Sequence, residues 1–102
     1  MSELVERPAA PLMAVLGLEE RDRDVYVGLT PSTRQQRIFG GQVAGQALMA
    51  AGRTAPAERA VHSLHSYFLR PGDPHEEIRY AVERIRDGRS FTTRRVLAFQ
   101  RR

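Results

Sequence analysis

The sequence predicts an α+β domain in which one long helix is followed by antiparallel strands. A stretch rich in alanine and glycine over 39–55 repeats its apolar residues at helical spacing. Two alternating runs, 77–85 and 91–100, flank an Asp-Gly turn that is typical of a β-hairpin. A β-branched and aromatic run over 61–69 ends at the turn Arg-Pro-Gly-Asp-Pro, which predicts a further strand.

Shorter elements precede the long helix. Residues 1–10 are predicted to form a flexible tail. Pro11 stands where the first residue of a helix is favoured, and the apolar cluster after it predicts a short helix. An acidic, arginine-rich stretch then leads into a predicted strand over 25–29, closed by Thr-Pro-Ser. Residues 33–38 are polar and connect this strand to the long helix.

The long helix is predicted to be slender, because most of its side chains are alanine or glycine. Glycine inside an exposed helix costs about 1 kcal/mol relative to alanine. We therefore expect neighbouring backbone to pack closely against Gly45 and Gly52 in compensation. An ordinary amphipathic core helix is the alternative.

Length and composition exclude several classes of protein. The 102 residues suffice for one domain only, and the absence of cysteine excludes disulfides, thiolate nucleophiles and cysteine-based zinc sites. No apolar run approaches the ~18 residues that a membrane span needs, and the acidic N-terminus has no apolar signal core. We expect a soluble cytoplasmic protein that does not bind membranes.

All 16 basic residues are arginine, and most of them follow residue 33. Arg89, Arg94 and Arg95 flank the predicted hairpin and are candidates for binding phosphate, although solvated surface charge explains them equally well. Nucleic-acid binding would require aromatic platforms, and only Phe91 and Phe99 lie nearby in the sequence. We expect no nucleic-acid partner.

The sequence contains no complete catalytic or metal-binding motif. His62 and His65 are three residues apart, so in a strand they point to opposite faces, and no third ligand is evident. Ser63, Ser66 and Ser90 lack a positioned base. No catalytic residue, metal site or cofactor is predicted.

The entrance to the long helix is the most promising binding feature. It consists of Gly40, Gly41 and Gln42, and the amide groups of a helix N-terminus suit an anion or a developing oxyanion. The alternative is a tight turn that simply requires glycine.

Three blocks of sequence resemble the N-terminal half of the TesB-like acyl-CoA thioesterases (acyl-CoA thioesterase II family). They are FGGQVAGQAL from Phe39, VHSLHSYFLRPGDP from Val61 and VERIRDGRSFTTRRV from Val82, and the resemblance covers about residues 12–100. It implies a hot-dog fold, in which an antiparallel sheet wraps around one long central helix. It further implies hydrolysis of fatty acyl-CoA to free fatty acid and CoA, in fatty acid metabolism, by a protein with paired hot-dog domains and no metal or cofactor.

The resemblance also implies which of the two domains carries the catalytic residues. The catalytic Asp, Ser or Thr, and Gln of the family are expected in the second domain, so this chain alone is expected to be inactive. Residues 11–102 are predicted to be an incomplete N-terminal hot-dog domain that lacks its closing strand. The expected partners are acyl-CoA and either a second hot-dog domain or a second copy covering the open sheet edge. The candidate substrate-binding residues are Gly41, Gln42, His65, Tyr67, Arg89 and Arg94.

A binding or assembly module without activity, or a truncated gene product, is the alternative to the thioesterase half. A second hot-dog domain encoded downstream, with an acidic residue and a hydroxyl-bearing partner on its strands, would favour the enzyme.

Overall fold

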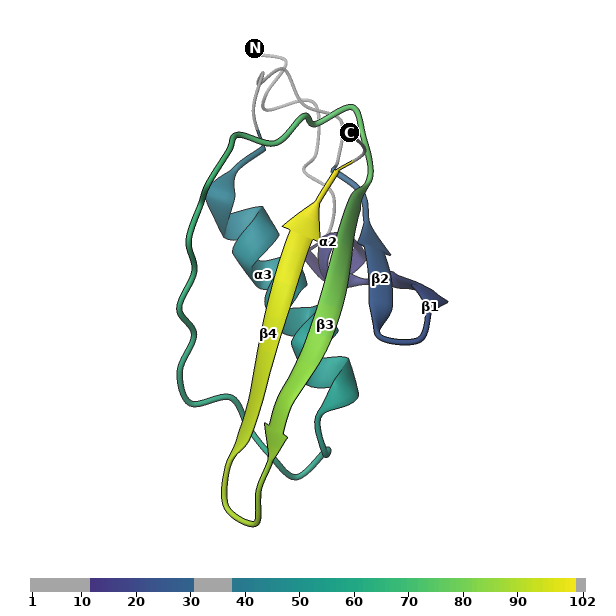
Figure 1. Ribbon diagram of the computed structural model, residues 1–102. Coiled ribbons are helices and arrows are strands. Elements are labelled where there is room, and N and C mark those ends of the chain that lie inside the picture. Colours follow the sequence, from purple (N-terminus) through teal and green to yellow (C-terminus); the bar gives the residue numbers. More distant parts are fainter. Residues whose placement is uncertain (1–11, 31–37, 101–102) are drawn as a thin grey trace.

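The computed structural model describes residues 12–30 and 38–100 (Figure 1). The predicted tail over 1–10 and most of the predicted connection over 33–38 lie outside these ranges. The elements in chain order are α2 (Leu12–Leu16), β1 (Glu19–Asp22), β2 (Val25–Gly28), α3 (Gly40–Thr54), β3 (Ile78–Asp87) and β4 (Thr92–Phe99). The predicted α+β class is confirmed.

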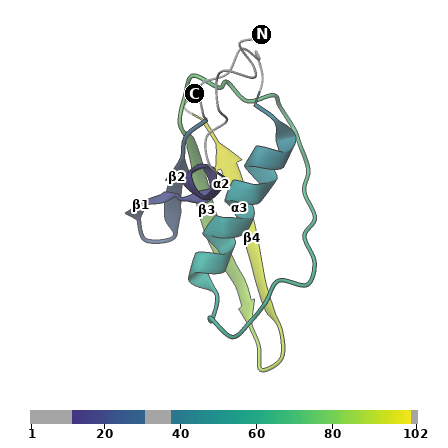
Figure 2. The ribbon, with the colours of Figure 1, turned by 180° about the vertical axis from the view of Figure 1, so that it is seen from behind.

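The four strands form one antiparallel sheet in the order β1-β2-β3-β4. Helix α3 lies along one face of the sheet, and the short helix α2 packs beside it, as the view from behind shows (Figure 2). The arrangement is a sheet laid against one central helix, as the resemblance implied.

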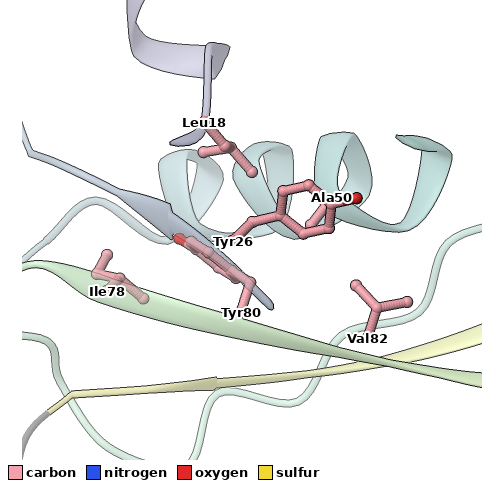
Figure 3. Close-up of a cluster of buried hydrophobic side chains, with 6 residues drawn as sticks. All are labelled: Leu18, Tyr26, Ala50, Ile78, Tyr80 and Val82. Atoms are coloured by element: carbon pink, nitrogen blue, oxygen red, sulfur yellow. The ribbon is translucent and has the colours of Figure 1, made fainter. Parts of the chain in front are cut away.

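The register of the sheet turns its apolar residues toward α3. Tyr80 lies opposite Tyr26 on one side and Ala98 on the other, and Val82 lies opposite Val96. Because side chains alternate between the two faces of a strand, these residues share a face. Figure 3 shows the resulting buried cluster, which consists of Leu18, Tyr26, Ala50, Ile78, Tyr80 and Val82.

A buried polar network crosses this core. Gln46 and Tyr80 are both fully buried, and the Tyr80 hydroxyl donates to Gln46 Oε1 at 2.5 Å. Gln46 Nε2 donates to the carbonyl oxygens of Val15 at 2.9 Å and Leu29 at 3.2 Å. One side chain of α3 is thereby bonded to β3, to α2 and to the end of β2, so it fixes the position of the helix on the sheet.

The two glycines inside α3 differ in their surroundings. A Cβ added to Gly45 would lie 3.2 Å from Leu16 Cδ2, so the close packing is confirmed, although the neighbour is a side chain of α2 and not backbone. At Gly52 an added Cβ would meet nothing within 4 Å, and the residue is exposed. The prediction of close packing is therefore wrong for Gly52, because this part of the helix faces away from α2 and the sheet.

Strand β1 was not predicted, because its four residues are all charged and exposed. It forms through a tight turn in which Asp24 adopts φ 59°, a conformation that aspartate tolerates better than most residues. Arg84 on β3 donates to both carboxylate oxygens of Asp24 at 2.9 Å, and this bonding lowers the pKa of Asp24. The turn is thus held against the sheet by an ion pair that its sequence does not reveal.

The predicted strand over 61–69 is wrong. These residues, called the outer segment below, run extended past α3 and β4 but belong to no strand, and each of them is exposed. Strand propensity does not suffice here, because a strand also needs a neighbour that supplies a ladder of hydrogen bonds. The two histidines accordingly do not occupy opposite faces of a sheet: His62 lies against Phe91, with ring centroids 5.8 Å apart, and His65 stacks on Tyr67 at 4.8 Å.

The remaining predicted elements are confirmed with small shifts of their ends. The Asp-Gly signal does mark a hairpin, although β3 continues through Asp87 and the Gly88 amide closes the turn onto the Phe91 carbonyl at 2.8 Å. Within residues 12–30 and 38–100, no helix is long and apolar enough to cross a membrane.

Candidate functional site

The candidate site begins at the N-terminus of α3. Phe39 is the N-cap and contributes no side-chain cap, while the Gln42 amide donates to the Phe39 carbonyl at 3.0 Å. The first amide groups of a helix have no intrahelical acceptor and carry the positive end of its dipole. Gly41 is exposed here, so the first turn presents backbone donors to solvent.

The side chain of Gln42 is already positioned. Its Nε2 donates to Thr30 Oγ1 at 3.0 Å and leaves its carbonyl oxygen as an acceptor. Thr30 was not singled out as a site residue from the sequence, because its contact with Gln42 joins two segments that are separated along the chain. A Cβ on Gly41 would lie 2.9 Å from Cζ of Phe39, whose exposed ring would have to shift to admit it.

The end of the outer segment lies beside this first turn. A Cβ on Gly40 would lie 3.4 Å from the ring of Phe68, and the Ile38 amide donates to the Gly72 carbonyl at 3.2 Å. His65 and Tyr67 precede Phe68 on the same segment. Of the six candidate residues, the structure places Gly41 and Gln42 in this first turn, whereas His65 and Tyr67 stack on each other in the outer segment and Phe68 makes the contact with Gly40.

The two candidate arginines lie at the opposite end of α3. Arg94 donates to the hydroxyl of Thr54, the last helical residue, at 2.7 Å and to its carbonyl at 2.9 Å. Its guanidinium also pairs with Asp87 at 2.9 Å, and its side chain is 5% exposed. Arg89 is exposed at the hairpin. A 15-residue helix is about 20 Å long, so neither arginine shares a site with Gly41.

The bonds of Arg94 indicate a structural role. A buried cation at a helix C-terminus complements the helix dipole and satisfies a terminal carbonyl group. Its guanidinium is already occupied by Thr54 and Asp87, whereas the Arg89 side chain projects from the turn.

Substituting these arginines separates the two roles. We expect Arg94→Met to lower the free energy of unfolding by about 2–3 kcal/mol, because it leaves the Asp87 charge and the Thr54 carbonyl without their buried partner. Arg89→Met should change it by less than about 0.5 kcal/mol, as is usual for exposed sites. Urea unfolding monitored by circular dichroism measures both, and equal effects would contradict the structural role of Arg94.

The described residues show no metal-binding cluster. Within 12–30 and 38–100, no group of three or more His, Asp or Glu side chains is placed to hold a metal ion. The chemistry available around the first turn of α3 is hydrogen bonding by backbone amides and Gln42, beside the aromatic rings of Phe39 and Phe68.

Comparisons with known proteins agree on one family. Residues 29–102 match the family model described as the acyl-CoA thioesterase N-terminal domain. Acyl-coenzyme A thioesterase 8 of Mus musculus is 50% identical over 90 residues, which are 85% of this chain and 28% of the mouse protein. Acyl-CoA thioesterase 2 of Haemophilus influenzae is 44% identical over 89 residues, which are 87% of this chain and 31% of that protein.

Solved structures give the same picture. A TesB protein of Mycobacterium avium subspecies paratuberculosis superposes with a TM-score of 0.81 at 43% identity, over 86% of this chain and 36% of that one. Acyl-CoA thioesterase II TesB2 of Mycobacterium marinum superposes with a TM-score of 0.77 at 49% identity, over 86% of this chain and 32% of that one. The chain thus spans roughly a third of the length of these proteins.

Proposed function

Because the chain belongs to the family of acyl-CoA thioesterase N-terminal domains, we propose that it contributes one hot-dog domain to an enzyme that hydrolyses fatty acyl-CoA. The products are the free fatty acid and CoA. The match of residues 29–102 to that family model carries the proposal. The cytoplasmic location and the role in fatty acid metabolism expected from the sequence belong to the same proposal.

The proposed reaction is attack of water on the thioester carbonyl. A new C–O bond forms while a base removes a proton from the water, and the tetrahedral intermediate then collapses with cleavage of the C–S bond and protonation of the thiolate. Among the described residues, the contacts given for the first turn of α3 come from Thr30, Phe39 and Phe68, and none of these three is a carboxylate. The base is accordingly assigned to a second domain.

This chain is assigned a binding role. The exposed first turn of α3 at Gly41 supplies amide groups suited to a developing oxyanion, and Gln42 supplies a positioned side-chain acceptor. The stacked pair His65 and Tyr67 lies on the neighbouring outer segment, where it would face the second domain and line the acyl site. Arg89 remains a candidate for phosphate, at a separate location.

A chimera tests this function. The chain replaces the matching region of the Haemophilus influenzae thioesterase, and hydrolysis is followed on a panel of short- to long-chain acyl-CoA. We expect turnover by the chimera and none by the 102-residue chain alone. An inactive but folded chimera, beside an active parent, would refute the proposed function. Substantial turnover by the isolated chain would refute the assignment of the base to a second domain.

The same chimera tests the binding role of one residue. His65→Ala should lower kcat/KM about 5- to 10-fold through a higher KM, the size expected for the loss of one aromatic contact. His75→Ala is the matched control, because His75 is exposed and its hydrogen bonds among the described residues are with Asp73. Unchanged kinetics for His65→Ala would remove that residue from the site without affecting the assignment of the reaction.

A further inference from the structure

The turn between β3 and β4 contains a pair of residues with a chemistry of its own. Asp87 is the last residue of β3, and Gly88 follows it. The side-chain carboxyl of an aspartate can be attacked by the backbone nitrogen of the next residue, and glycine obstructs this attack least because it has no side chain. The turn lies at the free end of the hairpin, away from the first turn of α3 (Figure 1). It is therefore separate from the candidate thioesterase site.

The composition of the chain singles out this pair. The 102 residues contain no asparagine, so deamidation of asparagine cannot give the same product. The other aspartates are Asp22, Asp24 and Asp73, and they are followed by arginine, valine and proline. Arginine and β-branched valine crowd the attacking nitrogen, and proline has no amide proton to release. Asp87 is the one aspartate of the sequence that precedes glycine.

The folded structure keeps the two reacting groups apart. Asp87 lies opposite Thr92 in the ladder of β3 and β4, so its backbone is extended. Ring closure needs the Asp87 side chain and the next nitrogen to eclipse each other about the Cα–C bond, which extended backbone does not allow. The Gly88 amide also donates to the Phe91 carbonyl at 2.8 Å. The attack therefore requires this end of the hairpin to open.

Two arginines hold the turn in this unreactive form. Arg94 pairs with the Asp87 carboxylate at 2.9 Å, and the Arg94 side chain is itself buried. Arg59, on the loop that leads to the outer segment, donates to the carbonyl oxygens of Gly88, at 2.9 Å, and Arg89. The Asp87 side chain is nevertheless half-exposed, so water reaches it as soon as the turn opens.

The reaction has two steps and needs only water. The Gly88 nitrogen forms a bond to Cγ of Asp87, and one carboxyl oxygen leaves as water, with the amide proton and one proton from solvent. The product of this step is a five-membered succinimide. Water then opens the ring. Addition at the Cγ carbonyl restores aspartate, whereas addition at the main-chain carbonyl gives isoaspartate, in which the main chain runs through Cβ and Cγ.

The isoaspartate does not fit the turn. It lengthens the main chain by one atom and attaches the free carboxylate directly to Cα. Both changes move the carboxylate away from Arg94 and the residue away from its ladder partner Thr92. Arg94 also donates to the Thr54 hydroxyl at 2.7 Å, so the loss of its carboxylate partner loosens the contact between the hairpin and the C-terminal end of α3.

We propose that Asp87 and Gly88 form a site of spontaneous aspartate isomerisation, which Arg94 and the Phe91 carbonyl keep unreactive in the folded protein and which opening of the hairpin exposes. Isomerisation then marks chains whose hairpin has opened, because the product no longer closes the turn. The mark is chemically distinct: the free α-carboxylate of isoaspartate accepts a methyl group from the sulfonium of S-adenosylmethionine, with S-adenosylhomocysteine as the leaving group.

The isoaspartate content of aged protein tests the proposal. The 102-residue chain and the chimera described above are incubated at neutral pH, with and without urea, and circular dichroism shows which samples are folded. The protease Asp-N, which cleaves before aspartate but not before isoaspartate, measures the product at Asp87. Methyl transfer by an isoaspartyl methyltransferase confirms the product in the isolated chain.

The folded protein should form isoaspartate about tenfold more slowly than the urea-unfolded protein, because both contacts that hold the turn must open first. Equal rates in folded and unfolded protein would show that the fold does not control the site. An absence of product in urea would show that the pair is unreactive. Either result overturns the proposal.

Two destabilised variants distinguish local opening from global unfolding. Arg94→Met should raise the rate in the folded protein about fivefold, because it frees the Asp87 carboxylate. Gly28→Ala instead disturbs Gln46, since its Cβ would lie 2.7 Å from Gln46 Cδ, and Gly28 pairs with the opposite end of β3. It should change the rate by less than about twofold. Equal acceleration by both variants would contradict the role of Arg94.

Asp87→Glu tests the effect of the product on the hairpin. Glutamate keeps the charge but does not form the five-membered ring. After ageing, the unfolding midpoint of the unaltered protein in urea should fall as its isoaspartate content rises, whereas the midpoint of aged Asp87→Glu should stay constant. A midpoint that is independent of isoaspartate content would refute the loosening of the hairpin.

Discussion

Replacing Gln46 by leucine is expected to lower the free energy of unfolding by about 3–4 kcal/mol. Leucine fills a similar volume, but it removes the acceptor of the Tyr80 hydroxyl and the donor that serves the carbonyl groups of Val15 and Leu29. Each buried polar group left without a partner costs about 1–3 kcal/mol. For a domain whose total stability is about 5–15 kcal/mol, such a loss is large. Chemical unfolding in urea measures it.

A double-mutant cycle shows whether the network itself is responsible. Burial raises the pKa of Tyr80, so its hydroxyl stays protonated and needs an acceptor across the ordinary pH range. The loss of unfolding free energy for Tyr80→Phe combined with Gln46→Leu should be about 1–2 kcal/mol smaller than the sum of the two single losses. The reason is that the double variant leaves no buried hydroxyl without an acceptor. Gln42→Leu, at a half-buried residue of the same helix, should cost about 1 kcal/mol or less. Equal losses at positions 42 and 46 would contradict the network.

Adding one methyl group at Gly28 is expected to destabilise the protein by about 3 kcal/mol. A Cβ there would lie 2.7 Å from Gln46 Cδ, and Gln46 cannot move aside without breaking its bonds to Tyr80 and to two carbonyl groups. Overpacking of this kind typically costs about 1–3 kcal/mol, and the loss of hydrogen bonds adds to it.

The same substitution at Gly52 should have the opposite sign. An added Cβ at this exposed helical position meets nothing within 4 Å, so Gly52→Ala gains helix propensity worth about 1 kcal/mol. Thermal unfolding of the two alanine variants side by side measures both effects. A destabilising Gly52→Ala, or a neutral Gly28→Ala, would show that the packing around α3 differs from the structure described above.

The elements with strong local signals were predictable from the sequence. The apolar spacing of α3, the alternation of β3 and β4, and the Asp-Gly turn between them all report on local geometry that each segment adopts by itself. The buried role of Gln46 was not predictable, because it depends on Tyr80, Val15 and Leu29, which lie far away along the chain.

The errors share a physical cause. The outer segment has strand propensity without a strand beside it, and β1 is a strand without strand propensity because β2 supplies its ladder. The candidate site shows the same pattern. The helix start at Gly41 and Gln42 was predictable from its local signature, whereas the structural role of Arg94 depends on Thr54 and Asp87, which surround it. Composition alone does not distinguish a buried arginine from a solvated one.

The antiparallel pairing of β2 with β3 sets the order in which the protein can be assembled. Gly28 and Ile78 are partners in this central ladder, so the whole of α3 and the loop after it are synthesised between them. Closing so long a chain segment between two paired strands is entropically unfavourable, so this pairing forms more slowly than local contacts do. On the ribosome, β2 can therefore pair with β1 and contact α3 early, but it lacks its central ladder partner until the β3 sequence has emerged.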